Sequence, residues 1–503
     1  MLLEKSILSL LIWLPIAGGM LALVLGGGAN AERARVIALI TAVLSLALCI
    51  PLYFGFDVAT PVMQFQERYP WIPAYNIQYA LGIDGISLTL IILANYTTLL
   101  VVLAGWQTIK VRVAQYMAAF LIMQGMMVGV FASLDSILFY VFWEGMLIPM
   151  YLSIGIWGSV NRSYASIKFF LYTFFGSALM LIALLYLGIQ AHSFEILNFY
   201  PLKLLMPIQV ALFIAFLLAF AVKIPMWPVH TWLPDAHTEA PAGGSVVLAA
   251  LMLKMGGYGF LRFSLPIVPD ACHALAHVLI VLSLIAIIYI GFVAIVQTDM
   301  KRLIAYSSIS HMGFVTLGCF IIYVIADKFQ QVSPMSLEGA MVQMISHAFS
   351  SGAMFLGVGV LYDRLHTRLI KDYGGVAHTM PIFAAFFMLF ALSNVGLPGT
   401  AGFVGEFMIL LSSFKANFWI TLLAGMTLIL GAAYTLWMYK RVFFGPIAHD
   451  GVAQLQDINY LERLIFILLA VGVIGIGIYP QAILDLLHTS IQHLLQLSLQ
   501  SKL

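Results

Sequence analysis

The chain has 503 residues, of which 62% are hydrophobic and only 9% are charged, and its formal net charge at pH 7 is +2. Soluble proteins carry roughly a quarter charged residues, so this composition excludes a soluble enzyme, a nucleic-acid-binding protein and a disordered scaffold. The sequence therefore indicates a protein that crosses a membrane many times.

Fourteen stretches are long and apolar enough to cross a bilayer, which takes about 20 residues in a helix. Twelve of them contain no Asp, Glu, Lys or Arg, and the other two are each interrupted by one charge, Glu144 or Lys254. We therefore predict an all-α polytopic membrane protein. The predicted spans are 6–31, 36–56, 85–109, 113–134, 136–156, 169–194, 204–222, 241–261, 271–298, 303–326, 339–362, 373–405, 416–439 and 464–484.

The orientation of these spans follows from the basic residues in the loops. The first apolar stretch is longer than the apolar part of a signal peptide and follows Glu4, so we expect an uncleaved first helix. With the N-terminus outside, the cytoplasmic loops hold 14 Lys and Arg residues and the outer loops hold 7. Because basic residues concentrate in cytoplasmic loops, both termini are predicted to lie outside.

Two segments outside the spans have a recognisable pattern. Residues 57–84 form an outer loop in which Ile77, Tyr79 and Leu81 alternate with other residues, and this loop is long enough for a short hairpin. Residues 481–499 place leucines and Ile491 at helical spacing beside Gln and His. This pattern predicts an amphipathic helix that lies in the membrane interface or on a partner.

The cysteines give no sign of a metal or redox centre. Cys49, Cys272 and Cys319 lie far apart inside apolar segments, without the spacing of zinc or iron–sulfur ligands. The segment 230–237 holds two histidines and an aspartate, but no recognised ligand spacing. We expect no metal and no cofactor in this chain.

Six ionisable residues lie at membrane depth. Each of them is costly there unless it is paired or hydrated, so such residues usually serve function. Carboxylates, amines and imidazoles together suit proton transfer, because imidazole titrates near neutral pH and has two nitrogens. Each of these residues could instead have a purely structural role. Buried ion pairs can fix helix packing, and lysines and acids near a helix end can extend to the membrane interface. Single histidines can be packed core residues. The six residues are Glu144, Lys223, Lys254, His311, His347 and Glu406.

Two of the spans contain residues that break a helix. Pro225 lies two residues after Lys223, and Pro398 and Gly399 interrupt the long uncharged stretch before Glu406. The breaks fall in the seventh and the twelfth span, five spans apart. Because five is odd, we predict that helices 4–8 are repeated by helices 9–13 in inverted orientation, as in secondary ion transporters.

The repeat divides the chain into four parts. We expect three N-terminal helices with the outer loop over 1–112, the first repeat over 113–262 and the inverted repeat over 263–445. The last helix and the amphipathic segment occupy 446–503.

Several motifs in these spans resemble those of the antiporter-like subunits of respiratory complex I, and the resemblance covers nearly the whole chain. Other members of that family usually carry a lysine in the second broken helix. This sequence has Glu406 there, and in this respect it resembles the M-type chains of NADH:quinone oxidoreductase. The motifs are Phe142-Trp143-Glu144, Ala221-Val222-Lys223-Ile224-Pro225, Trp232-Leu233-Pro234-Asp235-Ala236-His237, the run from Gln297 to Ser308, and Gly402-Phe403-Val404-Gly405-Glu406-Phe407.

The resemblance implies a subunit of the proton-translocating NADH:quinone reductase. In such a subunit Glu144 would pair with Lys223, and Lys254 would connect to the cytoplasmic side. His311 and His347 would bridge towards the second half-channel, which would end at Glu406 on the outer side. FMN, iron–sulfur clusters and quinone are expected in partner subunits. The expected neighbours are the antiporter-like chains L and N and lipids in a bacterial inner membrane, with neither nucleic acid nor a second copy of this chain.

Two other functions use the same residues. A subunit of a stand-alone Mrp-type sodium/proton antiporter would exchange sodium through these helices, although the sequence offers no acidic cage for sodium and Glu406 argues against it. A passive membrane spacer would keep the buried charges only as packing devices. It predicts that neutral replacements of matched volume, such as Lys254→Met, leave function intact.

Overall fold

The computed structural model describes residues 6–27 and 30–503. Lys5, which is predicted to lie on the outer side, and residues 28–29, which are predicted to belong to the first span, are not among the described residues. Thirteen of the described helices are long and apolar enough to cross a membrane. The remaining predicted span, 373–405, consists of two shorter helices, α17 (Pro381–Val395) and α18 (Ala401–Ala416). The prediction of about 14 spans, with a discontinuous twelfth, is therefore confirmed.

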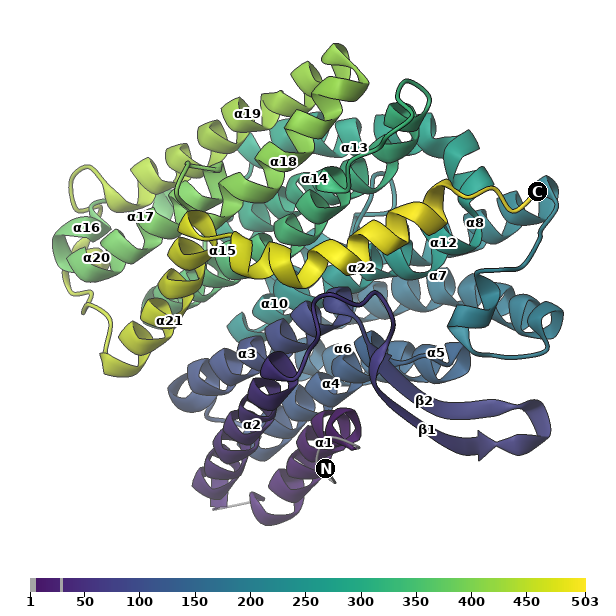
Figure 1. Cartoon of the computed structure of the whole chain (residues 1–503). Coiled ribbons are helices and arrows are strands. Elements are labelled where there is room, and N and C mark those ends of the chain that lie inside the picture. The colour runs from purple at the N-terminus through teal and green to yellow at the C-terminus, as the bar shows by residue number, and fades with distance from the viewer. Residues whose placement is uncertain (1–5, 28–29) are drawn as a thin grey trace.

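The N-terminal part contains three long helices and a hairpin, drawn in purple and blue in Figure 1. The predicted hairpin in the outer loop is confirmed, since its two strands pair antiparallel, with Arg68 opposite Ala80. Asp84 then caps the next helix by accepting the N–H of Ser87. These elements are α1 (Ile7–Leu25), α2 (Ala31–Phe54), β1 (Gln64–Ile72), the short turn Pro73–Tyr75, β2 (Ile77–Ile83) and α3 (Gly85–Thr108).

The first repeat follows, and its fourth span is broken as predicted. The helix α8 ends at Lys223 and the chain becomes helical again only at Trp232. The fifth span is one continuous rod in which two π-helical turns, Leu248–Met252 and Phe260–Ser264, separate three α-helical pieces. The elements are α4 (Val113–Ala132), α5 (Ser136–Gly145), α6 (Leu147–Trp157), α7 (Arg162–Ala191), the turn Ile196–Phe199, α8 (Met206–Lys223), α9 (Trp232–Glu239), α10 (Ala242–Val247), α11 (Leu253–Gly259) and α12 (Leu265–Ile267).

The second repeat has the same order, with three long helices, a broken span and a fifth helix. Gly396 and Gly399 adopt left-handed backbone angles at the second break, with φ of +83° and +89°, which glycine adopts without a steric penalty. The elements are α13 (Pro269–Ile295), α14 (Met300–Ala326), α15 (Met335–Leu365), the turn Ile370–Asp372, α16 (Val376–Thr379), α17, α18 and α19 (Phe418–Phe443), followed by α20 (Asp450–Ala453), α21 (Tyr460–Ile478) and α22 (Gln481–Leu499).

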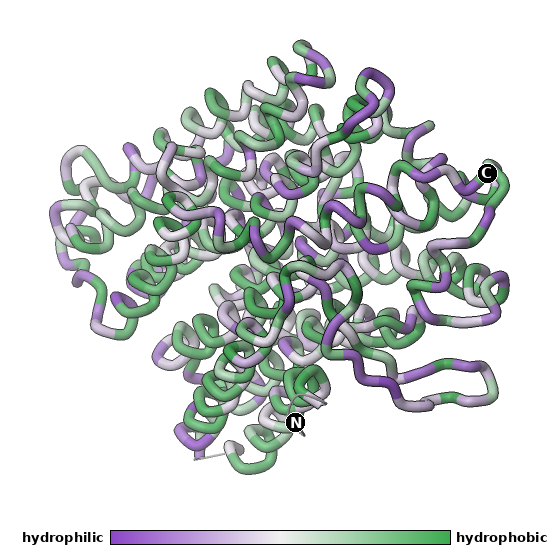
Figure 2. Tube along the Cα trace, in the orientation of Figure 1, coloured by the Kyte–Doolittle hydropathy of each residue, from purple (hydrophilic) through white to green (hydrophobic). Residues whose placement is uncertain are grey.

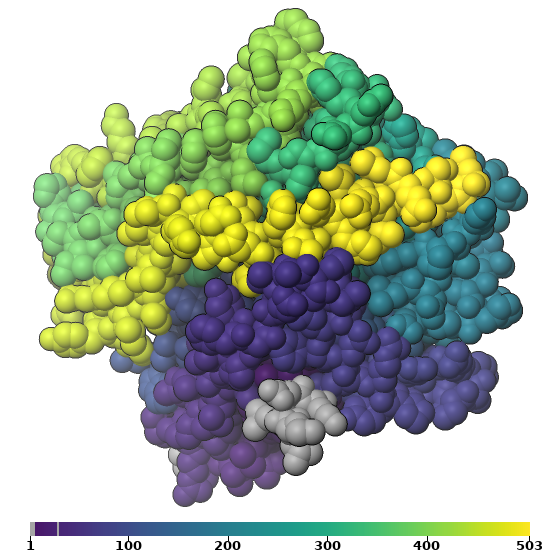
Figure 3. All heavy atoms as spheres, viewed as in Figure 1, coloured from purple at the N-terminus to yellow at the C-terminus, as the bar shows by residue number. Residues whose placement is uncertain are grey.

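The predicted amphipathic helix is α22, and it lies on this chain's own helices. Figures 1 and 3 show it in yellow, laid across the ends of the other helices, where it contacts α3, α12, α13 and α15. Ser490 accepts the N–H of Gly85 at 2.9 Å, and Nδ1 of His488 lies 2.6 Å from the carboxylate of Glu338. Figure 2 shows that the helices are mostly hydrophobic along their length, as a protein surrounded by lipid requires.

Glu67 in β1 joins the hairpin to the first span. Its carboxylate is buried and accepts the backbone N–H groups of Leu8 at 2.8 Å and Ser9 at 3.2 Å, as well as the Ser9 hydroxyl. The first N–H groups of a helix have no partner inside the helix, and a carboxylate also complements the positive end of the helix dipole. The hairpin therefore holds the start of α1 in place.

Replacing Glu67 by alanine leaves these buried donors without an acceptor. We expect Glu67→Ala to lower the free energy of unfolding by about 1–3 kcal/mol, the usual cost of burying groups without a partner. The unfolding temperature of the detergent-solubilised protein measures this loss. Tyr75→Ala, at a 71% exposed position on the turn of the same hairpin, is the matched control and should unfold at the wild-type temperature. Identical unfolding temperatures for Glu67→Ala and wild type would show that the contact does not anchor α1.

Candidate functional site

The six predicted site residues come from six different helices. Glu144 lies in α5, Lys223 ends α8, Lys254 lies in α11, and the remaining three lie in α14, α15 and α18. All are buried except Glu144, which is half-buried. The structure joins four of them into two close pairs, and the other two lie apart.

The first pair is Lys254 with His347. The Lys254 ammonium nitrogen, Nζ, lies 2.6 Å from Nδ1 of His347 and donates to the carbonyl oxygen of Ala249 at 2.5 Å. Ala249 belongs to the first π-helical turn, directly before α11, and such turns frequently occur at functional sites. The local widening of the helix thus supplies a backbone acceptor to a lysine that is fully buried.

The second pair is His311 with Glu406. Nδ1 of His311 lies 2.7 Å from Oε1 of Glu406, and the amide of Gln343 donates to the same oxygen at 3.0 Å. The helix break lies beside this carboxylate, because a Cβ atom added to Gly396 would be 3.4 Å from Oε2 of Glu406. The broken helix therefore places a buried acid where an imidazole and an amide can bind it.

The two pairs approach each other through their imidazoles. The ring centroids of His311 and His347 are 5.7 Å apart, with an angle of 54° between the ring planes. The second nitrogen of each ring, Nε2, is buried and has no hydrogen-bond partner among the described residues. Lys254, His347, His311 and Glu406 thus form a row of ionisable groups with one gap, between the two rings.

The expected ion pair between Glu144 and Lys223 is not present. Neither Nζ of Lys223 nor Oε1 of Glu144 has a hydrogen-bond partner in the described part of the chain, and Nζ lies 5.0 Å from the ring centroid of Trp143. Nζ of Lys223 therefore lies over the Trp143 ring without an ion pair to the neighbouring Glu144. The two charges remain within electrostatic reach of each other.

The first break also borders Lys254's helix. A Cβ atom added to Gly256 would lie 2.7 Å from the backbone nitrogen of Ile224. Only a glycine at this position lets α11 approach the end of α8 so closely. The residue that follows Lys223 is thus packed against the helix that carries Lys254.

His237 is a buried ionisable residue that the sequence analysis considered only as a metal ligand. Its side chain is 0% exposed, both ring nitrogens lack partners among the described residues, and the ring stacks on Phe355 at 4.4 Å. It lies within electrostatic reach of Lys254 and of Lys301. No three His, Cys, Asp or Glu side chains gather as metal ligands would in the described ranges 6–27 and 30–503. The sequence signal for His237 was its position in the second half of a broken helix.

Ion pairs hold this second half-helix, α9, to the second repeat. Asp235 binds Lys168 at 2.7 Å and Arg302 at 2.8 Å. Arg368, which follows α15, lies 3.8 Å from Glu239 and 3.2 Å from Asp299. The charged residues of the two central motifs therefore link the repeats.

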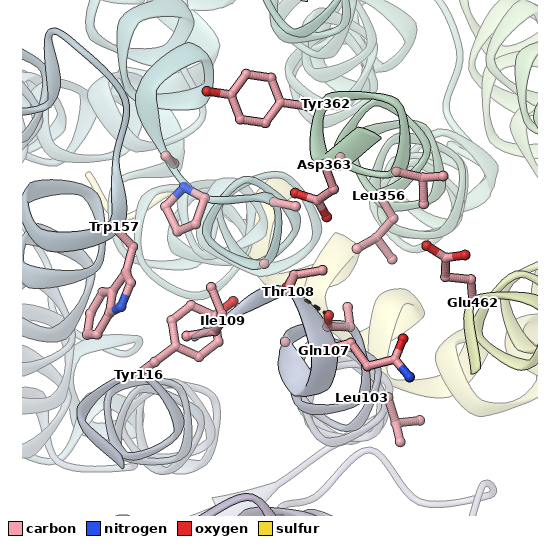
Figure 4. A pocket seen from close by; sticks show the side chains of 18 of the residues that line it. Leu103, Gln107, Thr108, Ile109, Tyr116, Trp157, Leu356, Tyr362, Asp363 and Glu462 are labelled. Atoms are coloured by element: carbon pink, nitrogen blue, oxygen red, sulfur yellow. Dashed lines mark hydrogen bonds between the residues drawn. The ribbon is translucent and has the colours of Figure 1, made fainter. Parts of the chain in front are cut away.

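A cavity of about 350 Å³ opens between α3, α4, α10, α15 and α21. Figure 4 shows its labelled polar side chains, including Gln107, Asp363 and Glu462, with Trp157 and Tyr116 on the opposite side. Lys301 and Glu239 also line it, so the cavity reaches the ion pairs that surround α9.

Comparison with known proteins gives consistent matches over nearly the whole chain. The family described as NADH:quinone oxidoreductase/Mrp antiporter matches residues 133–431, and the family described as NADH-ubiquinone oxidoreductase chain 4, amino terminus, matches residues 35–132. The NADH-quinone oxidoreductase subunit M of Rhodobacter capsulatus is 45% identical, over 98% of this chain and 97% of the relative. The NADH-ubiquinone oxidoreductase chain 4 of Marchantia polymorpha is 43% identical, over 98% of this chain and 97% of its own length.

Solved structures show the same fold. A chain in respiratory complex I from Thermus thermophilus with bound NADH superposes with a TM-score of 0.87 and 30% identity, over 97% of this chain and 99% of that chain. A chain in the Mrp complex from Dietzia sp. DQ12-45-1b superposes with a TM-score of 0.81 and 20% identity, over 96% of this chain but only 52% of that chain. At this lower identity the second match concerns the fold alone.

Proposed function

This chain belongs to the family of NADH-quinone oxidoreductase subunit M chains, and we propose that it translocates protons as a membrane subunit of a bacterial respiratory complex I. The observation that carries the proposal is the buried row Lys254, His347, His311 and Glu406. Its two close contacts, at 2.6 and 2.7 Å, are within the distance over which protons transfer directly.

The chemistry of the row favours protons over other ions. An imidazole accepts a proton at one nitrogen and releases one at the other, so two imidazoles between an amine and a carboxylate form a relay. Nε2 of each ring has no hydrogen-bond partner among the described residues, so both nitrogens are free to bind water. Sodium prefers several oxygen ligands, whereas Glu406 is held by one imidazole nitrogen and one amide donor.

Glu144 and Lys223 are proposed to couple this row to the rest of the complex. Nζ of Lys223 and Oε1 of Glu144 have no hydrogen-bond partner among the described residues, and the backbone break after Lys223 packs on the helix of Lys254. A movement that brings Lys223 from Trp143 to Glu144 would change the field at Lys254. Moving one proton against 100 mV takes about 2.3 kcal/mol, which electrostatic rearrangements in a low-dielectric interior readily supply.

The partners follow from the same proposal. NADH oxidation and quinone reduction, with FMN and iron–sulfur clusters, take place in other subunits of the complex. Chains L and N are the neighbours in the bacterial inner membrane, and both termini of this chain face the periplasm. The boundaries between the four predicted parts of the chain, at 112/113, 262/263 and 445/446, stay predictions.

The first test replaces Lys254 by methionine, which keeps the volume and removes the amine. We expect Lys254→Met to lower the ratio of protons moved to NADH oxidised in membrane vesicles, because it interrupts the row beside His347. Lys254→Arg keeps a cation but not an amine that releases its proton, so it should not restore the ratio. An unchanged ratio in Lys254→Met would support the passive spacer instead.

The second test concerns coupling. Glu144→Gln removes the charge that Lys223 would approach, and we expect proton translocation to fall while the complex still assembles. Glu144→Asp, which keeps the carboxylate, should retain part of the activity. The readout is the quenching of a pH-sensitive dye by vesicles that oxidise NADH. Full quenching in Glu144→Gln would remove Glu144 from the mechanism without affecting the row.

The third test separates complex I from a stand-alone antiporter. The tagged chain is extracted gently from its native membrane, and the mass and visible absorbance of the co-purified material are recorded. We expect a large particle with flavin and iron–sulfur absorbance. A colourless assembly of membrane chains alone, with sodium-dependent proton exchange, would establish the antiporter.

A further inference from the structure

A buried ion pair, Arg262 with Asp84, joins the first repeat to the N-terminal helices. Nη2 of Arg262 donates to Oδ2 of Asp84 at 2.7 Å, and the two residues are only 8% and 4% exposed. The other carboxylate oxygen of Asp84 accepts the backbone N–H of Ser87 at 2.9 Å. Both oxygens of the carboxylate are therefore occupied. Charged residues buried in a membrane protein usually serve function, and this pair has no role in the row of Lys254.

Arg262 belongs to the same continuous rod as Lys254. Lys254 and Tyr258 are four residues apart in α11, so they share one face of the helix. The hydroxyl of Tyr258 accepts Nε of Arg262 at 3.2 Å, and Arg262 lies in the second π-helical turn, directly after α11. In the orientation of the proposed function this end of the rod faces the outer side. The order towards the outer side is therefore Lys254, Tyr258 and Arg262.

Further hydrogen bonds hold the guanidinium and its neighbours in place. Nη2 of Arg262 also donates to the hydroxyl of Ser87 at 3.3 Å, and the backbone carbonyl of Arg262 accepts the hydroxyl of Tyr200 at 3.2 Å. The hydroxyl of Tyr258 donates to the backbone carbonyl of Phe131 at 3.1 Å. The Tyr258 proton is thus bound to the backbone of α4, and the positive charge of Arg262 has a fixed position.

The amphipathic helix α22 lies against both elements that carry the ion pair. Ser490 of α22 accepts the N–H of Gly85, the residue directly after Asp84. A Cβ atom added to Gly85 would collide with the backbone carbonyl oxygen of Leu486, so only glycine lets α22 approach so closely. The same helix contacts α12, which directly follows the π-helical turn of Arg262 (Figure 1). The ion pair is therefore enclosed between the rod and α22.

We propose that Arg262, held by Asp84, is a fixed positive charge that keeps protons at Lys254 from reaching the outer side through the first repeat. A guanidinium stays protonated and cannot relay a proton as an amine or an imidazole does. It also repels an approaching positive charge, as arginines do in pores that exclude protons. Protons at Lys254 then leave towards His347. The inference rests on the proposed function and adds a barrier to its row of ionisable groups.

The experiment measures the passive proton leak of liposomes that contain the purified complex, with a potassium diffusion potential and without NADH. The double variant Arg262→Gln with Asp84→Asn removes both charges and leaves no lone charge buried. We expect its leak to exceed the wild-type leak about tenfold, because removing a repulsion of about 1.4 kcal/mol changes a rate by that factor. Adding Lys254→Met should return the leak to the wild-type value, since the leaking protons would pass through Lys254.

Arg68→Gln with Glu195→Gln is the matched control. This ion pair, at 2.6 Å, also joins an arginine to a carboxylate, but Arg68 lies in β1 and not on the rod of Lys254. Its leak should equal the wild-type leak. A wild-type leak in the first double variant, or an increased leak that persists with Lys254→Met, overturns the barrier and leaves the proposed function in place. An unchanged ratio of protons moved to NADH oxidised in Lys254→Met alone contradicts the proposed function itself.

A single variant covers a failure of the double variant to assemble. Arg262→Lys keeps a cation beside Asp84, but it replaces a group that holds its proton by an amine that can release it. We expect its leak to exceed the wild-type leak, and Lys254→Met to remove the excess. A wild-type leak in Arg262→Lys would show that the guanidinium is not the barrier.

Discussion

The constraint on which this structure depends is that an ionisable side chain inside a bilayer is costly unless it is paired or hydrated. Lys254 is fully buried, and it receives both an imidazole nitrogen and a backbone carbonyl. Glu406 receives an imidazole and an amide. Without these partners each group would be costly at membrane depth. The interior helices α14 and α15, which carry the two histidines, are accordingly buried along nearly their whole length.

The two broken helices position the ionisable residues of the site. A break exposes backbone groups that lipid cannot satisfy, so it survives only inside the protein. Here each break lies beside an ionisable residue: Gly396 beside Glu406, and Ile224 next to Lys223 and against α11. The ion pairs of Asp235 with Lys168 and Arg302 then fix the separated half-helix α9. A movement of α9 would therefore displace His237 and, through Asp235, also shift Arg302 in the second repeat.

Lys223 and His237 differ from the row in having no hydrogen bond to hold their nitrogens, within the residues that the structure describes. Both lie at the first broken helix, one at the end of α8 and one in α9. Groups without fixed partners can change contacts at little cost, whereas the paired groups of the row cannot. This contrast divides the buried charges into a fixed path and two positions that can respond to a neighbouring subunit.

The sequence by itself determined the spans, the hairpin, the amphipathic helix, both helix breaks and the six ionisable residues, because each depends on local composition and spacing. It did not determine which residues meet. The pair Lys254 and His347 is 93 residues apart in sequence, and the pair His311 and Glu406 is 95 apart. Their contacts, the position of the Lys223 ammonium over Trp143, and the stacking of His237 on Phe355 all depend on how helices far apart in the chain pack. Only the tertiary structure decides these, since the rotation of each helix about its axis is set by its neighbours and not by its own sequence.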